Sequence, residues 1–139
     1  MGAWGHGYFE DDSALDFMAD IEESDNPKEI INGAFDTAIG SDYVDQDQGN
    51  AAIVAAAHID SHLNGTKFSH GDQIEPLDVD TFSERHPDID FSDLRKKALL
   101  ALNKILSDKS ELKELWEENE EDYPSWRKGI EQLIQRLEK

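Results

Sequence analysis

Two histidines, His58 and His62, stand four residues apart in a segment with helical spacing. Residues at this spacing lie on one face of an α-helix, and paired histidines so placed can bind zinc. In zinc hydrolases a glutamate beside the first histidine acts as the base, whereas Ile59 occupies that position here. The pattern leaves two alternatives, a metal site that takes a third ligand from elsewhere in the chain, or a pair of surface histidines.

Three aspartates, Asp42, Asp45 and Asp47, precede this segment in a polar stretch. An EF-hand calcium loop needs glycine at its sixth position and glutamate at its twelfth. Counted from Asp45, these positions hold Asn50 and Ala56, so an EF-hand is not predicted. Because loops present side chains without disturbing the core, we predict that the three aspartates bind a basic partner. A solvated capping loop and a weak, nonspecific cation site are the alternatives.

The first sixteen residues combine glycines with large aromatic side chains. Glycine propagates a helix poorly, and the rings need burial, so we predict an ordered, non-helical arm that packs its aromatic side chains. Ser13 and Asp16 then resemble a capping box, which predicts the start of a helix. His6 with the nearby aspartates could act in acid–base catalysis, but capping and packing explain these residues without it.

This stretch resembles the start of a bacterial family known as domain of unknown function four-two-five-nine. Its members open with Met-Gly-Ala-Trp-Gly and continue with Phe, an Asn/Asp-Asp pair, Ala and Asp. The matching residues are Trp4, Gly5, Gly7, Phe9, Asp11, Asp12, Ala14 and Asp16. The resemblance implies no established activity, so the function has to be argued from the residues themselves.

The net charge is −19, and it is unevenly distributed along the chain. Residues 1–90 hold 21 acidic and 3 basic residues, whereas residues 91–139 hold 11 acidic and 10 basic ones. Such acidity repels phosphates and argues against nucleic-acid binding. It favours a basic protein partner, bound cations or simple solubility.

Several classes of protein are disfavoured by what the chain lacks. With no cysteine, disulfides and thiolate metal sites are excluded. No apolar run has the length of a membrane span, and the N-terminus has neither the basic nor the apolar part of a secretory signal. We therefore expect a cytoplasmic protein that binds neither a membrane nor a cofactor.

Apolar spacing and capping residues predict the secondary structure. Helices are expected over about 13–23, 27–40 and 48–63, with a short one possible at 78–85. A further helix is expected after a cap at Asp90 or Ser92, with its apolar face reaching Leu106, and another after a cap at Ser110. Tyr123-Pro124 is expected to interrupt the chain before a final helix, whose apolar stripe runs from Trp126 to Leu137. The small side chains of the third helix predict a central position, and Gly33 is expected to permit a close helix crossing. Together these features predict an all-α, single-domain bundle of five or six helices over 1–139, with the Gly/aromatic arm packed across it.

We interpret the chain as a non-enzymatic, acidic, protein-binding protein without catalytic residues. An immunity- or antitoxin-type inhibitor of a basic toxin is the most concrete form, because such a protein needs only a complementary acidic surface. The alternative is a metal-binding protein or metal-dependent enzyme that uses His58 and His62. A third class is a structural or regulatory domain. The oligomeric state stays open.

Overall fold

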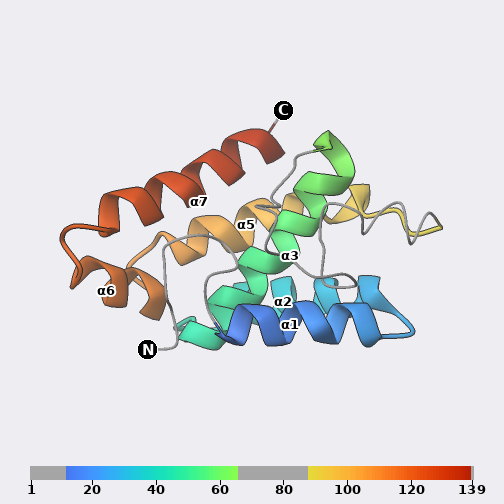
Figure 1. Ribbon diagram of the computed structural model, residues 1–139, viewed down its shortest axis with the longest axis horizontal. Helices are drawn as coiled ribbons and strands as arrows, with labels where there is room; N and C mark the ends of the chain where they lie inside the picture. The colour runs from blue at the N-terminus through green and yellow to red at the C-terminus, as the bar shows by residue number, and fades with distance from the viewer. Residues whose placement is uncertain (1–11, 66–87, 139) are drawn as a thin grey trace.

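The computed structural model describes residues 12–65 and 88–138. Over these residues the chain forms α-helices and one short 3-10 turn, with no β-strand (Figure 1). The elements are α1 (Asp12–Glu23), α2 (Pro27–Gly40), α3 (Gln46–Asn64), η2 (Ser92–Leu94), α5 (Arg95–Ile105), α6 (Glu111–Glu117) and α7 (Tyr123–Leu137). The predicted all-α class is confirmed. The predicted N-terminal arm and the possible helix at 78–85 lie outside the described residues.

Helix α3 begins two residues earlier than the sequence predicts, because Asp45 caps it. The Asp45 carboxylate accepts a 2.8 Å bond from the Gln48 backbone N–H, and the Gln48 side chain accepts a 3.1 Å bond from the Asp45 N–H. This reciprocal capping box satisfies two backbone donors at the helix start. The helix ends at Asn64 and is capped by Gly65, whose positive φ of 69° suits glycine and whose N–H bonds to the Ser61 carbonyl.

The predicted central position of α3 is also confirmed. The helix runs between α1 and α2 on one side and α5 and α7 on the other, and it contacts all four (Figure 1). Every residue from Ala52 to Ser61 is buried. Four of these ten residues are alanine, and their small side chains let neighbouring helices approach closely.

Helices α2 and α5 are joined by a lysine that caps the end of α2. The last carbonyls of a helix have no intrahelical partner. The Lys104 ammonium of α5 donates to the carbonyls of Ile39, at 2.9 Å, and of Ser41. Nearby, Val44 pairs with Ser110 in an isolated bridge that connects the loops after α2 and α5. These contacts hold the start of α3 against the start of α6.

Helix α7 begins at Tyr123, three residues before Trp126, the first residue of its predicted apolar stripe. The prediction that Tyr123-Pro124 interrupts the chain before this helix is wrong, because Pro124 lies in its first turn. An N–H in that turn has no intrahelical acceptor, so proline costs nothing there. Trp126 then stacks on Trp116 of α6 with ring centroids 6.3 Å apart.

Two glycines show where helices do and do not approach closely. A Cβ built at Gly49 of α3 would lie 2.6 Å from a methyl carbon of Leu112, so α3 and α6 pack tightly there. At Gly33 of α2, a Cβ would meet no atom of the described residues within 4 Å. The close helix crossing expected at Gly33 is therefore absent from the part of the chain that the structure describes.

Candidate functional site

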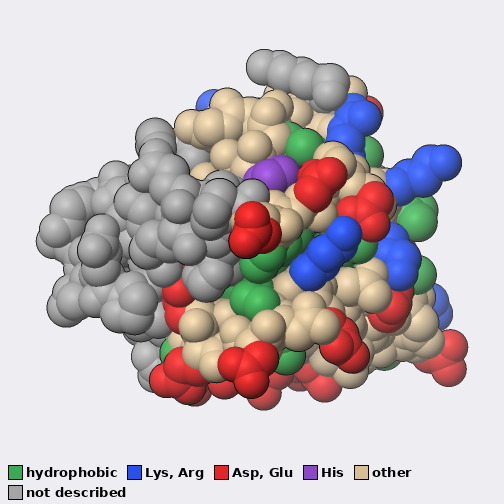
Figure 2. Space-filling model, turned by 90° about the vertical axis from the view of Figure 1, so that its right-hand side faces the viewer, with side chains coloured by type: hydrophobic (Ala, Val, Ile, Leu, Met, Phe, Trp, Pro, Cys, Tyr) green, Lys and Arg blue, Asp and Glu red, His purple; other side chains and the backbone are tan. Residues whose placement is uncertain are grey.

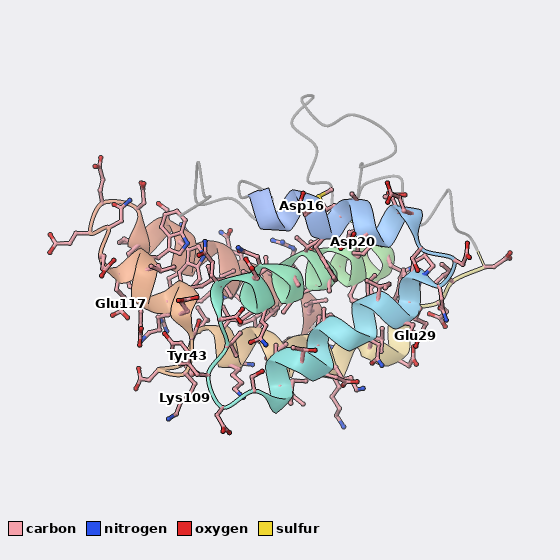
Figure 3. The ribbon with its side chains drawn as sticks, turned by 90° about the horizontal axis from the view of Figure 1, so that it is seen from below. Asp16, Asp20, Glu29, Tyr43, Lys109 and Glu117 are labelled. Atoms are coloured by element: carbon pink, nitrogen blue, oxygen red, sulfur yellow. The ribbon has the colours of Figure 1, made fainter. Side chains whose placement is uncertain are left out.

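An open groove of about 990 Å³ lies between α1 and α2. The first turns of α3 form its floor through Asp47, Gln48 and Ala51. In Figure 3, α1 and α2 diverge from the loop that joins them, and α3 is visible between them. Phe17, Ile30 and Ala51 supply the main apolar surface of the groove, and each is only partly buried.

Acidic side chains surround this apolar surface. Of the residues that the structure shows lining the groove, five are acidic and none is basic. The five, all exposed, are Asp20, Glu23, Glu29, Asp36 and Asp47. In Figure 2, acidic side chains gather along the lower margin of the molecule, the side on which α1 and α2 lie in Figure 1. The arrangement suits a ligand that carries positive charge.

Two of these carboxylates have partners among the described residues, and three have none there. Asp36 forms a 2.8 Å ion pair with Lys97 of α5, and Glu29 accepts a 3.0 Å bond from the Asn26 amide. Within residues 12–65 and 88–138, Asp20, Glu23 and Asp47 form no side-chain hydrogen bond or ion pair. A cationic ligand at these three would displace no contact within the described part of the chain.

The three aspartates predicted to bind a basic partner are placed in different surroundings. Only Asp47 lines the groove. Asp45 is occupied in capping α3, while Asp42 is exposed in the loop before it. Sequence reasoning missed Asp20 and Glu23, although their spacing on α1 puts both on one helix face. The three-residue spacing is visible in the sequence. To see that it points both side chains into the groove, one must know which face of α1 packs on the core.

The paired histidines occupy unlike positions on α3. His58 is 2% exposed, and its Nδ1–H donates to the Val54 carbonyl at 2.9 Å. His62 is partly buried, with its Nε2 3.4 Å from an Asp90 carboxylate oxygen. The description of both as surface histidines is therefore wrong for His58. No group of three or more potential metal ligands occurs among the described residues.

A polar cluster that the sequence analysis did not predict connects α3 to α7. The fully buried Asp60 accepts a 2.6 Å bond from Arg136 Nε and a 2.7 Å bond from the Asn64 amide. The same amide group donates to the Arg136 carbonyl at 3.0 Å. Buried carboxylates require such partners because desolvation of the charge is costly. The cluster therefore holds the C-terminal helix on the core.

Two exposed groups have shifted pKa values with clear causes. The backbone N–H of Ser92 bonds to Asp90 at 2.9 Å and holds the pKa of that carboxyl below its ordinary value of 3.8. The Glu114 carboxylate accepts a 2.6 Å bond from the Tyr43 hydroxyl and raises the pKa of Tyr43 to about 12. Neither group lines the groove, so both shifts belong to loop and helix contacts.

A model of the family described as domain of unknown function (DUF4259) matches residues 2–129. The chain belongs to this family. The DUF4259 match spans every residue of the groove but ends before Arg136. No curated protein and no solved structure matches the chain. Within the described parts of this DUF4259 protein, no helix is both long and apolar enough to cross a membrane.

Proposed function

We propose that this DUF4259 protein acts by binding a basic protein partner at the groove between α1 and α2, and that it catalyses no reaction. The observation that carries the proposal is the lining of the groove, where the described residues place five carboxylates and no basic side chain around an apolar surface. Three of the carboxylates, Asp20, Glu23 and Asp47, support no contact within the described residues. Like charges in such proximity oppose folding, so a use in recognition gives a reason to keep them.

An inhibitor of a basic toxin, of the immunity or antitoxin type, is the most specific form of this proposal. Such a protein needs a rigid complementary surface, and acidic charge speeds the encounter with a basic enzyme. The same charge repels nucleic acid. We propose that the chain works as one domain in the cytoplasm, where it needs neither a cofactor nor a membrane.

A captured partner tests the proposal directly. The protein is immobilised, and lysate is passed over it at low salt. The groove variant Asp20→Asn/Glu23→Gln/Asp47→Asn removes three charges, and Glu118→Gln/Glu120→Gln/Glu121→Gln removes three exposed charges near the start of α7. We expect the wild-type protein to capture a basic protein that is eluted by salt. The affinity for this partner should be about tenfold lower in the groove variant and unchanged in the control variant. Equal capture by both variants, or no basic protein bound, would refute the proposal.

The metal alternative has a separate test. In the structure, His58 Nδ1 bonds to a backbone carbonyl and His62 Nε2 faces a carboxylate, so a metal at either atom would displace an existing contact. We expect purified protein to lack stoichiometric zinc by elemental analysis. If the purified protein holds one metal per chain and His58→Gln/His62→Gln loses it, the metal-binding alternative is correct.

A further inference from the structure

Gly33 is a residue of α2 that the described fold does not require. It lies in the interior of the helix without a positive φ, and a Cβ there would meet no described atom within 4 Å. Glycine in a helix interior costs about 1 kcal/mol relative to alanine. Gly33 is exposed and lines the groove, so it keeps this wall of the groove bare. A bare backbone at such a position suits close approach by another molecule.

The dimensions and apolar surface of the groove indicate the shape of that molecule. Two turns of α-helix are about 11 Å long and 10–12 Å wide with side chains, a volume of the same order as the groove. Phe17, Ile30 and Ala51 offer apolar contacts within it. A purely charged ligand, such as a polyamine or an oligolysine, would leave these contacts unused. A helix with an apolar stripe would cover them.

The carboxylates lie on more than one side of this apolar surface. Asp20 and Glu23 come from α1, Glu29 from α2 and Asp47 from α3. A helix seated between them would meet negative charge on both flanks of its apolar stripe. From this arrangement we infer that the occupant of the groove is an amphipathic helix of a partner protein, with Lys or Arg flanking its apolar stripe, and that it crosses α2 at Gly33. This inference rests on the proposed binding function and specifies its ligand.

Two peptides of identical composition distinguish binding that depends on an apolar helix face from binding that depends on charge alone. One is a helical Leu/Lys peptide whose leucines form a single stripe, and the other has the same residues rearranged so that no stripe exists. Binding of each labelled peptide is measured by fluorescence anisotropy at low salt. We expect the striped peptide to bind at least about tenfold more tightly, because only its leucines can all reach the apolar surface.

Variants of α2 then locate the bound peptide. Gly33→Leu fills the groove without a change of charge, and Gly33→Arg adds a positive charge as well. Gly40→Arg is the matched control, because Gly40 is also exposed with open space at its Cβ but does not line the groove. We expect both Gly33 variants to lower the affinity for the striped peptide at least about tenfold, and Gly40→Arg to lower it by less than about threefold. Circular dichroism and thermal unfolding confirm that each variant is folded.

Each other outcome overturns the inference in a recognisable way. If both peptides bind equally and Gly33→Leu binds like the wild type, basic ligands are held by charge alone, and the proposed function survives without the helix. If neither peptide binds, the inference is wrong, and the capture experiment decides the function independently. If sedimentation shows a dimer and Gly33→Leu dissociates it, a second copy of the chain fills the groove. The inference that a different protein supplies the helix is then wrong.

Discussion

Asp60 on α3 and Arg136 on α7 are joined by a 2.6 Å bond between Oδ2 and Nε, and the Asp60 side chain is fully buried. The two residues lie 76 positions apart in the chain. A charge-assisted bond of this kind is stronger than a neutral one. Loss of the cation would leave a carboxylate inside the core, so this contact controls how firmly α7 is attached.

Replacement of Arg136 by methionine is expected to lower the free energy of unfolding by about 1.5–3 kcal/mol, the usual value of a hydrogen bond to a charged group. Arg127→Met is the control on the same helix, because Arg127 makes only a 3.2 Å bond to the Tyr123 hydroxyl and a long, exposed ion pair with Glu131 at 3.7 Å within the described residues. An exposed pair contributes about 0–1 kcal/mol. Urea denaturation measures both. A double-mutant cycle with Asp60→Asn should give a coupling of about 0.5–3 kcal/mol, and a coupling near zero would contradict the assignment.

Alanine at the two glycines should change stability in opposite directions. Gly33→Ala is expected to stabilise the protein by about 0.5–1 kcal/mol, because the helix gains propensity and the new methyl group meets open space. Gly49→Ala should destabilise it by about 1 kcal/mol, because overpacking against the buried Leu112 outweighs the gain in propensity. Thermal and urea unfolding give the comparison. If Gly49→Ala also stabilises the protein, Leu112 of α6 can move away from the new methyl group at lower cost than the tight packing indicates.

The cap at Asp45 predicts a difference between two aspartates in one loop. Asp45→Ala should cost about 0.5–2 kcal/mol, because the capping box at the start of α3 is lost. Asp42→Ala should leave the free energy of unfolding nearly unchanged, since Asp42 is exposed and forms no side-chain bond within the described residues. Equal effects in urea denaturation would show that the cap is unimportant. A binding test that replaces Asp45 would confuse lost stability with lost recognition, which is why the groove variant omits it.

Tyr43 should ionise late in an alkaline titration. Its bond to Glu114 raises its pKa from the ordinary 10.0 to about 12, so the contact stabilises the fold below pH 10 and is lost as the pH rises towards 12. Glu114→Gln is expected to return the pKa of Tyr43 towards 10.0, because the acceptor loses its negative charge. Ring-carbon NMR titration, assigned with Tyr43→Phe, measures this. Glu118→Gln controls for the loss of one charge, and the same shift in that variant would refute the specific contact.

Helix positions were largely predictable because their signals are local. The apolar spacing of α2 and the proline at its start predict its bounds as the structure has them. The small residues of α3 also predict its central place. Errors arose where a local signal had two meanings. The pair Tyr123-Pro124 can end a helix or begin one, and the polar residues before α3 can form a loop or a cap.

The sequence by itself determined the all-α class, the family and the acidic balance of the chain, because periodicity, a short motif and composition need no knowledge of contacts. Only the tertiary structure decided where the groove lies and which carboxylates line it. Asp20 and Asp47 line the same groove because α1 packs on α3, and Asp60 meets Arg136 through the packing of α7. Such pairs depend on how helix faces are matched across the core, and that matching results from the summed packing of many side chains.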